Sequence, residues 1–111
     1  MVTVTSEMQG SVKLVKVDGR LDGFAAPQLE TELQNAIKNK QNKIVVDLTK
    51  TEFLSSAGMR ALLHARQQVQ DKKGDLRLVG PSPYIFESLQ LVGLDKLFKI
   101  YSTTDQALAG F

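Results

Sequence analysis

Two adjacent hydroxyl side chains, Ser55 and Ser56, lie where an apolar run gives way to a helical pattern, in the sequence FLSSAGMRALL. A serine at the start of a helix can accept a hydrogen bond from a first-turn backbone N–H, which stabilises the helix by about 1 kcal/mol. The same unpaired N–H groups and the positive end of the helix dipole can also hold a phosphate. The junction therefore predicts either a structural cap or a phosphorylation site, and the stretch alone favours the cap.

The other residues show few of the patterns that are typical of catalytic sites. His64, the only histidine, follows Ser56 on the same predicted helix, which places the two roughly 12 Å apart along its axis. A nucleophile and its base need hydrogen-bond contact, so these two residues cannot form such a pair. The chain has no cysteine, no GxxxxGK[ST] loop and no clustered carboxylates. We therefore expect that the protein is not an enzyme and binds no cofactor and no metal. A hydrolase that used Ser56 as its nucleophile would need a base from elsewhere in the chain.

The composition indicates one globular domain. The 111 residues are 42% hydrophobic and 23% charged, with a formal net charge of +2, and basic residues alternate with acidic ones along the chain. Nucleic-acid footprints concentrate charge on one surface, so we expect no direct binding of nucleic acid. No apolar run approaches the roughly 20 residues that span a bilayer, and the N-terminus lacks the order of a signal peptide. These features predict a cytoplasmic protein with no membrane segment.

Alternating strand and helix patterns fill the chain. Strands are expected at 2–8, 12–17, 44–48, 76–79 and 97–101. Helices are expected to begin near Pro27, at Ser56, before Ile85 and at a capping box opened by Ser102. Residues 49–55 are expected to form a loop. The order ββαβαβαβα predicts an α/β fold for the single domain 1–111, with a mixed four- to five-stranded sheet and about four helices packed largely on one face.

Three regions together resemble one protein family. They are IVVDLTKTEFLSSAGMRALL at 44–63, GRLD at 19–22 and LQLVGLDKLFKIY at 89–101. These runs are similar to the signature of STAS domains, specifically the bacterial anti-sigma factor antagonists, and they occur in the family's order. The resemblance covers almost the whole chain. It implies the STAS fold, a mixed sheet with helices packed largely on one side, which agrees with the element order above.

The resemblance implies a partner switch. An unphosphorylated antagonist of this type binds an anti-sigma factor that is also a serine kinase, and the sigma factor is released. The kinase then phosphorylates a serine at the start of the second helix, the antagonist dissociates, and a PP2C-type phosphatase resets the system. Alignment of the family's usual D-S-[ST]-G motif on Gly58 places Ser55 at the usual Asp, Ser56 at the acceptor and Ala57 at the second hydroxyl. Ser56 is the expected acceptor, with Ser55 as the fallback.

A partner-binding surface around this serine is also implied. It would consist of Asp22, Phe24, Ser55, Ser56, Ala57, Met59 and Arg60. Phe24 and Met59 could form its desolvated centre, whereas Asp22 is either the family's acidic residue near the acceptor or a plain acid before the first helix. The alternative function is a STAS module that binds a ligand or scaffolds a sensory or transport-associated complex, without a sigma-factor branch. We expect a monomer or a weak homodimer paired through an exposed N-terminal strand.

Overall fold

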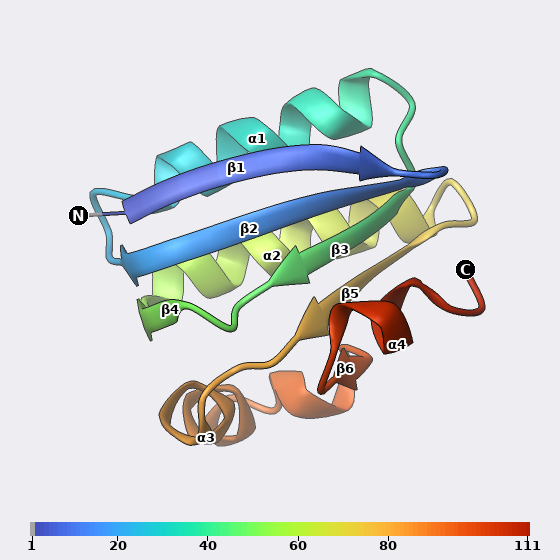
Figure 1. Ribbon diagram of the computed structural model, residues 1–111. Coiled ribbons are helices and arrows are strands. Elements are labelled where there is room, and N and C mark those ends of the chain that lie inside the picture. Colours follow the sequence, from blue (N-terminus) through green and yellow to red (C-terminus); the bar gives the residue numbers. More distant parts are fainter. Residues whose placement is uncertain (1) are drawn as a thin grey trace.

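A mixed sheet forms the centre of the computed structural model, which describes residues 2–111 (Figure 1). The strand order is β1-β2-β3-β5-β6. The strands on this path are β1 (Val2–Gln9), β2 (Val12–Leu21), β3 (Lys43–Asp47), β5 (Asp75–Val79) and β6 (Ile100–Tyr101). β1 and β2 form an antiparallel hairpin, and the remaining pairs are parallel. The predicted hairpin followed by parallel crossovers is confirmed.

Two helices cover one face of this sheet. α1 (Ala26–Lys38) and α2 (Ser56–Gln70) lie side by side behind it in Figure 1. Their apolar stripes join the inward side chains of β2, β3 and β5 in the main core, which also takes in α3 (Pro83–Leu91) at one end. Short α4 (Thr104–Leu108) lies on the opposite face, against β3, β5 and β6. The predicted α/β class, with helices largely on one face, is confirmed, although residues 2–111 form a six-stranded sheet rather than one of four to five strands.

The segment after β3 corrects one prediction, because part of the expected loop 49–55 is a strand. β4 (Thr51–Leu54) pairs in parallel with the far end of β2, beyond the last residues that pair with β3. The Thr51 hydroxyl donates to the backbone oxygen of Val17 at 2.8 Å, which ties the start of β4 to β2. β2 can serve two partners because it continues through Asp18 and Gly19, where the strand expected over 12–17 would have closed. It bends there, with a glycine φ of 108° and a shift in register, and continues to Leu21.

The C-terminal third differs from expectation in two details. The strand expected over 97–101 is limited to β6, since Leu94–Lys96 form a 3-10 turn and Phe98 is buried in the core. The cap of α4 is Thr103 rather than Ser102, because the Thr103 hydroxyl accepts a hydrogen bond from the Gln106 N–H at 3.2 Å. Gly93 follows α3 with a φ of 77°, the left-handed conformation in which a glycine commonly ends a helix.

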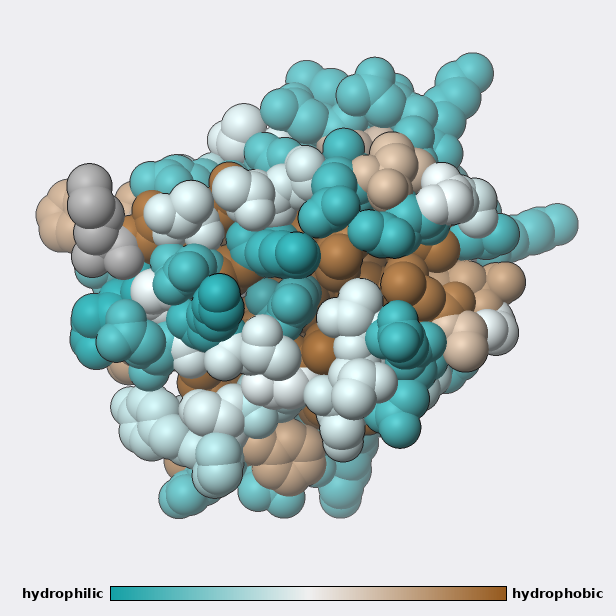
Figure 2. All heavy atoms as spheres, in the orientation of Figure 1, coloured by the Kyte–Doolittle hydropathy of each residue, from teal (hydrophilic) through white to brown (hydrophobic). Residues whose placement is uncertain are grey.

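A buried arginine fastens the chain's last residues to the sheet. Arg77 of β5 is only 6% exposed, and its guanidinium donates to the backbone oxygens of Ala107 and Ala109, each at 3.0 Å. The Phe111 ring covers the same guanidinium at 3.8 Å, and the Asp75 carboxylate lies 3.5 Å away. These contacts compensate the desolvation of the charge and hold α4 on the second face. Figure 2, which views that face, shows hydrophobic side chains between polar ones near its middle.

Candidate functional site

The junction between β4 and α2 is built by Ser55. Its backbone is extended (φ −75°, ψ 165°), and its N–H donates to the Leu21 oxygen at the end of β2, at 2.9 Å. Its hydroxyl oxygen accepts the Gly58 N–H at 3.1 Å, while its backbone oxygen accepts the Met59 N–H at 2.9 Å. Ser55 is therefore the N-cap of α2, which settles the structural role that the sequence left open between two serines.

Ser56 has a different position from its neighbour. It is the first residue of α2 and is exposed to solvent. Within residues 2–111 its hydroxyl makes no hydrogen bond, so the oxygen is free. The N–H groups of Ser56 and Ala57 lie in the first helical turn, where the helix supplies no acceptor for them. The arrangement presents a free hydroxyl beside unpaired donors at the positive end of the α2 dipole.

Gly58 allows α2 to begin this close to the sheet. A Cβ at this position would lie 2.7 Å from Leu21 Cδ2 and 2.9 Å from Leu54 Cδ1, closer than real Cβ contacts. Both leucines are buried in the main core. The lack of a side chain at Gly58 therefore sets the depth of the first turn, and with it the exposure of Ser56.

The loop before α1 contributes Asp22 and Phe24. The Asp22 carboxylate accepts the Ala25 N–H at 2.9 Å, and its backbone oxygen accepts the Ala26 N–H at 2.9 Å. Asp22 thus stabilises the turn that opens α1, as a plain acid before a helix would. The Phe24 side chain is 98% exposed. An aromatic ring in full contact with water contributes nothing to the core, so its exposed position needs another explanation.

Two shallow hollows meet at α2. The first lies between the starts of α1 and α2, and its lining includes Gly23, Ala26, Ala57 and Arg60. The second lies between α2 and the segment after α3, and is lined by Ser56, Met59, Arg60, Leu63, Val92 and Leu94. Arg60 borders both, while Asp22 and Phe24 line neither. The structure therefore gathers Ser56, Met59 and Arg60 at one place and leaves Phe24 beside it.

Val92 and Leu94 were missing from the predicted surface. Val92 and its neighbour Leu91 are exposed, at 59% and 80%, although both are apolar. The sequence LQLVGL reads as the end of a buried helix followed by a glycine stop, so periodicity alone does not mark these residues as surface. The run LQLVGL contains more apolar residues than one helix face can bury, and this excess could have indicated that some of them are exposed.

His64 contacts the neighbouring helix rather than Ser56. His64 is exposed on α2, and its Nδ1 lies 3.4 Å from Oε1 of Glu30 on α1. Across residues 2–111 no group of three or more His, Cys, Asp or Glu side chains is placed to hold a metal ion. No helix in that range is long and apolar enough to cross a membrane.

Comparison with known proteins identifies the family. The family model for the STAS domain matches residues 3–107, so this chain belongs to the STAS family. RsfB of Mycobacterium tuberculosis, named as an anti-sigma-F factor antagonist, is 28% identical over 109 residues, covering 98% of this chain and 88% of that protein. An anti-sigma F factor antagonist of Paenibacillus polymyxa is 26% identical over 106 residues, covering 95% and 91%.

A solved structure agrees with these relatives. An anti-sigma factor antagonist from Mycobacterium paratuberculosis is 31% identical and superposes with a TM-score of 0.89, covering 97% of this chain and 92% of that one. The resemblance inferred from the three sequence regions is confirmed at the level of the family. The relatives share one named role, antagonism of an anti-sigma factor, and they match this chain along nearly its full length.

Proposed function

We propose that this protein is an anti-sigma factor antagonist that works by phosphorylation-controlled partner switching. In its unphosphorylated form it binds an anti-sigma factor serine kinase through the surface around Ser56, and phosphorylation of Ser56 releases it. A PP2C-type phosphatase returns it to the binding form. The observation that carries the proposal is the free, exposed hydroxyl of Ser56 in a chain whose near full-length relatives are named antagonists.

Ser56 is favoured over Ser55 as the acceptor. The Ser55 oxygen already accepts the Gly58 N–H, and its modification would have to break the cap of α2. The Ser56 hydroxyl can be modified without loss of a hydrogen bond to residues 2–111. A phosphate there would add about −1.5 to −2 charge and could accept hydrogen bonds from first-turn N–H groups, so the fold would not need to change.

The apolar side chains beside Ser56 supply the reason for release. Met59, Leu63 and Val92 share a hollow with Ser56, and a partner that seats an apolar group there must exclude water. A phosphate dianion at the rim of that hollow would also have to lose its water, and the one cation that lines the hollow, Arg60, could offset only part of its charge. Phosphorylation would then remove the partner by desolvation cost and repulsion rather than by reshaping the antagonist.

The proposal is tested by measuring binding to the cognate kinase for the wild type, Ser56→Ala and Ser56→Asp. We expect Ser56→Ala to bind the kinase and to stay bound when ATP is added, because it cannot be phosphorylated at this position. Ser56→Asp should bind about tenfold more weakly than the wild type or worse, a loss of about 1.4 kcal/mol of binding free energy. Mass spectrometry after incubation with kinase and ATP should find one phosphate, on Ser56.

Ser11 offers a matched control for the added charge. It is exposed in the turn between β1 and β2, at the end of the molecule away from α2's first residue (Figure 1). Ser11→Asp should bind the kinase as the wild type does. Tight binding by Ser56→Asp would contradict release by charge, and a phosphate found on Ser55 in the wild type would contradict the assignment of the acceptor. Lack of binding by any form would favour a STAS module that serves as a ligand-binding or scaffolding unit.

A further inference from the structure

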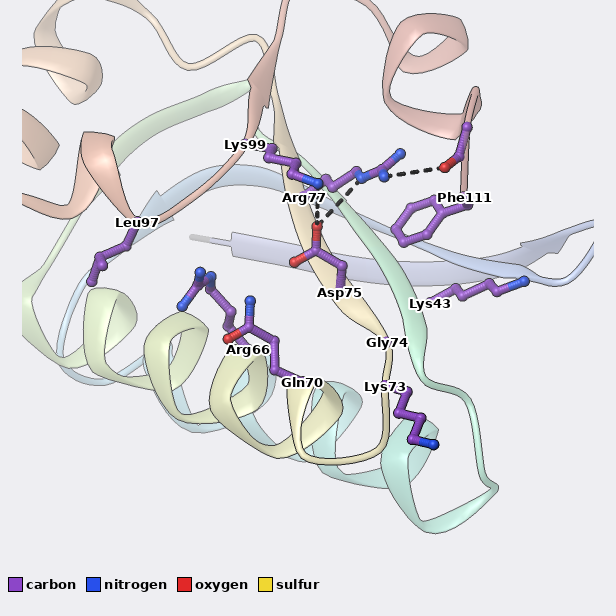
Figure 3. A pocket seen from close by; sticks show the side chains of 11 residues that line it. Lys43, Arg66, Gln70, Lys73, Gly74, Asp75, Arg77, Leu97, Lys99 and Phe111 are labelled. Carbon is purple, nitrogen blue, oxygen red and sulfur yellow. Dashed lines mark hydrogen bonds and ion pairs between the residues drawn. The ribbon is translucent and has the colours of Figure 1, made fainter.

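A basic hollow lies at the end of the molecule away from Ser56. It has a volume of about 320 Å³ and is enclosed by the second half of α2, the start of β5 and the chain's last residues (Figure 3). Five basic side chains and one acidic side chain line it, namely Lys43, Arg66, Lys73, Arg77, Lys99 and Asp75. Their formal charge is +4, whereas the whole chain carries +2, so all other side chains together carry −2. The positive charge of the protein is therefore concentrated here.

The single acidic side chain does not neutralise these five basic side chains. Asp75 Oδ2 lies 3.5 Å from Arg77 Nε and 3.7 Å from Lys99 Nζ, so one anion already faces two cations. Arg66, Lys43 and Lys73 form no ion pair with any carboxylate of residues 2–111. Like charges gathered without counter-charges repel one another, and an added anion relieves that repulsion.

Arg66 is the strongest sign of a ligand. Its Nε is buried and has no hydrogen-bond partner among the described residues, which is unfavourable for a charged donor. The Phe98 ring, 5.7 Å from the guanidinium carbon, helps to fix its position. In Figure 3 no dashed line reaches the Arg66 head group, whereas dashed lines join Arg77 and Lys99 to the Asp75 carboxylate.

We propose that this hollow binds a small molecule that carries a phosphate group. Guanidinium and ammonium groups bind phosphate through charge-assisted hydrogen bonds, and a dianion matches the excess of cations better than a single carboxylate does. Leu97 and Phe111 add apolar surface that an organic body can contact. The volume lies at the lower limit for small-molecule sites, which favours a compact ligand.

The site is independent of the partner switch. Arg66 is ten residues beyond Ser56 on α2, roughly 15 Å along the helix axis. Figure 1 places the start of α2 and the C-terminus at opposite ends of the molecule. A phosphate bound near Arg66 cannot contact Ser56, so the outcome of the kinase-binding experiment does not affect this proposal.

Titration of the full chain followed by amide NMR and calorimetry tests the proposal. The probes are inorganic phosphate and phenyl phosphate, added at low ionic strength. We expect saturable binding of phenyl phosphate with shifts confined to residues near 43, 66–77 and 97–111. Tighter binding of phenyl phosphate than of inorganic phosphate would assign the site to an organic phosphate, and equal binding would assign it to free phosphate.

Variants separate this site from general attraction to a positive protein. Arg66→Gln and Lys99→Gln should each weaken binding about tenfold. Lys50→Gln removes the same charge from an exposed turn between β3 and β4 and should leave the affinity unchanged. Lys99→Gln changes an exposed side chain, so its result holds even where Arg66→Gln lowers stability.

Three results would overturn the proposal. They are a lack of saturable binding, an equal loss of affinity in Lys50→Gln, and stronger binding of a short single-stranded oligonucleotide than of phenyl phosphate. The last result would assign the basic hollow to a nucleic acid instead of a small molecule.

Discussion

One hydrogen bond separates two serines that look alike in the sequence. Ser55 accepts the Gly58 N–H and donates its own N–H to Leu21, so its side chain and backbone are both engaged. Ser56 begins the helix and presents its hydroxyl to water. The family motif has Asp where this chain has Ser55, and both residue types are good N-caps. The exchange therefore keeps the helix start intact while removing one negative charge beside Ser56, the proposed acceptor.

Removal of that cap should lower stability while leaving Ser56, the proposed acceptor, in place. Ser55→Ala leaves the Gly58 N–H without its side-chain acceptor, and we expect the free energy of unfolding to fall by about 1 kcal/mol. Urea denaturation followed by circular dichroism measures this change. Ser55→Asp is the matched control, since a carboxylate can accept the same N–H and should keep wild-type stability.

The same variant bears on the phosphorylation site. Ser55→Ala should still gain one phosphate from the kinase, on Ser56. Loss of phosphorylation in Ser55→Ala, together with its retention in Ser56→Ala, would reverse the two roles.

At the scale of elements, the position of α2 depends on β4 and on the extended end of β2. These elements were the parts of the fold that the sequence predicted least well. TEFL is only four residues long and contains two polar side chains, and Gly19 reads as the end of a strand. The pairing exists because Gly19 adopts a φ of 108° and lets β2 continue at a shifted register. Such a long-range pairing has no local pattern that could predict it.

Other elements followed directly from local chemistry. α1 carries buried residues at helical spacing, β3 is a short β-branched run with its middle buried, and Gly93 stops α3. In α2 the helical spacing of Met59, Leu62, Leu63 and Val69 predicts an inner stripe. Leu62 and Val69 are buried, but Met59 and Leu63 are only half-buried. Small residues take the inner positions instead, because α2 packs closely against α1 and β5. Helical periodicity predicts a face, but it does not predict how near the neighbouring element comes.

The closeness of α2 to the sheet makes Gly58 a sensitive position. Alanine is normally the better helix former by about 0.5–1 kcal/mol, so Gly58→Ala would stabilise an isolated helix. Here the new methyl would meet Leu21 and Leu54 at distances under 3 Å. We expect overpacking to prevail and the free energy of unfolding to fall by about 1–2 kcal/mol, measured by urea denaturation.

A second glycine provides the control for this substitution. A Cβ at Gly23 would have no heavy atom within 4 Å, so Gly23→Ala should leave stability nearly unchanged. A Gly58→Ala variant that is more stable than the wild type would show that the first turn of α2 can move outward at no cost.

At the scale of the whole molecule, Arg77 joins the end of the chain to the sheet. Arg77→Met removes the donors to Ala107 and Ala109 and leaves Asp75 with Lys99 alone. We expect the free energy of unfolding to fall by about 3 kcal/mol, and amide hydrogen exchange in α4 to speed up more than in α1. Arg60→Met, at an exposed arginine, should change the free energy of unfolding little.

The basic hollow is formed by residues that are far apart in the sequence, which explains why the sequence pattern did not predict it. Its cations are spread from Lys43 to Lys99 in the sequence, with acidic and neutral residues between them. The sequence therefore predicted an evenly charged surface. Only the parallel arrangement of β3 and β5, with α2 ending beside them, brings these side chains to one end of the molecule.

The separation of Ser56 from that basic end has an electrical consequence. The unmodified chain has a formal charge of +2, and one phosphoserine would cancel most of it. The cations of the hollow would remain, so the modified molecule would be nearly neutral overall but strongly dipolar, negative at one end of α2 and positive toward the other. The electrostatic field of a partner would then exert mainly a torque on the molecule, which orients it, and only a weak net attraction. Phosphorylation at one exposed hydroxyl would thus change the orientation in which the protein approaches its partners, before any contact is made.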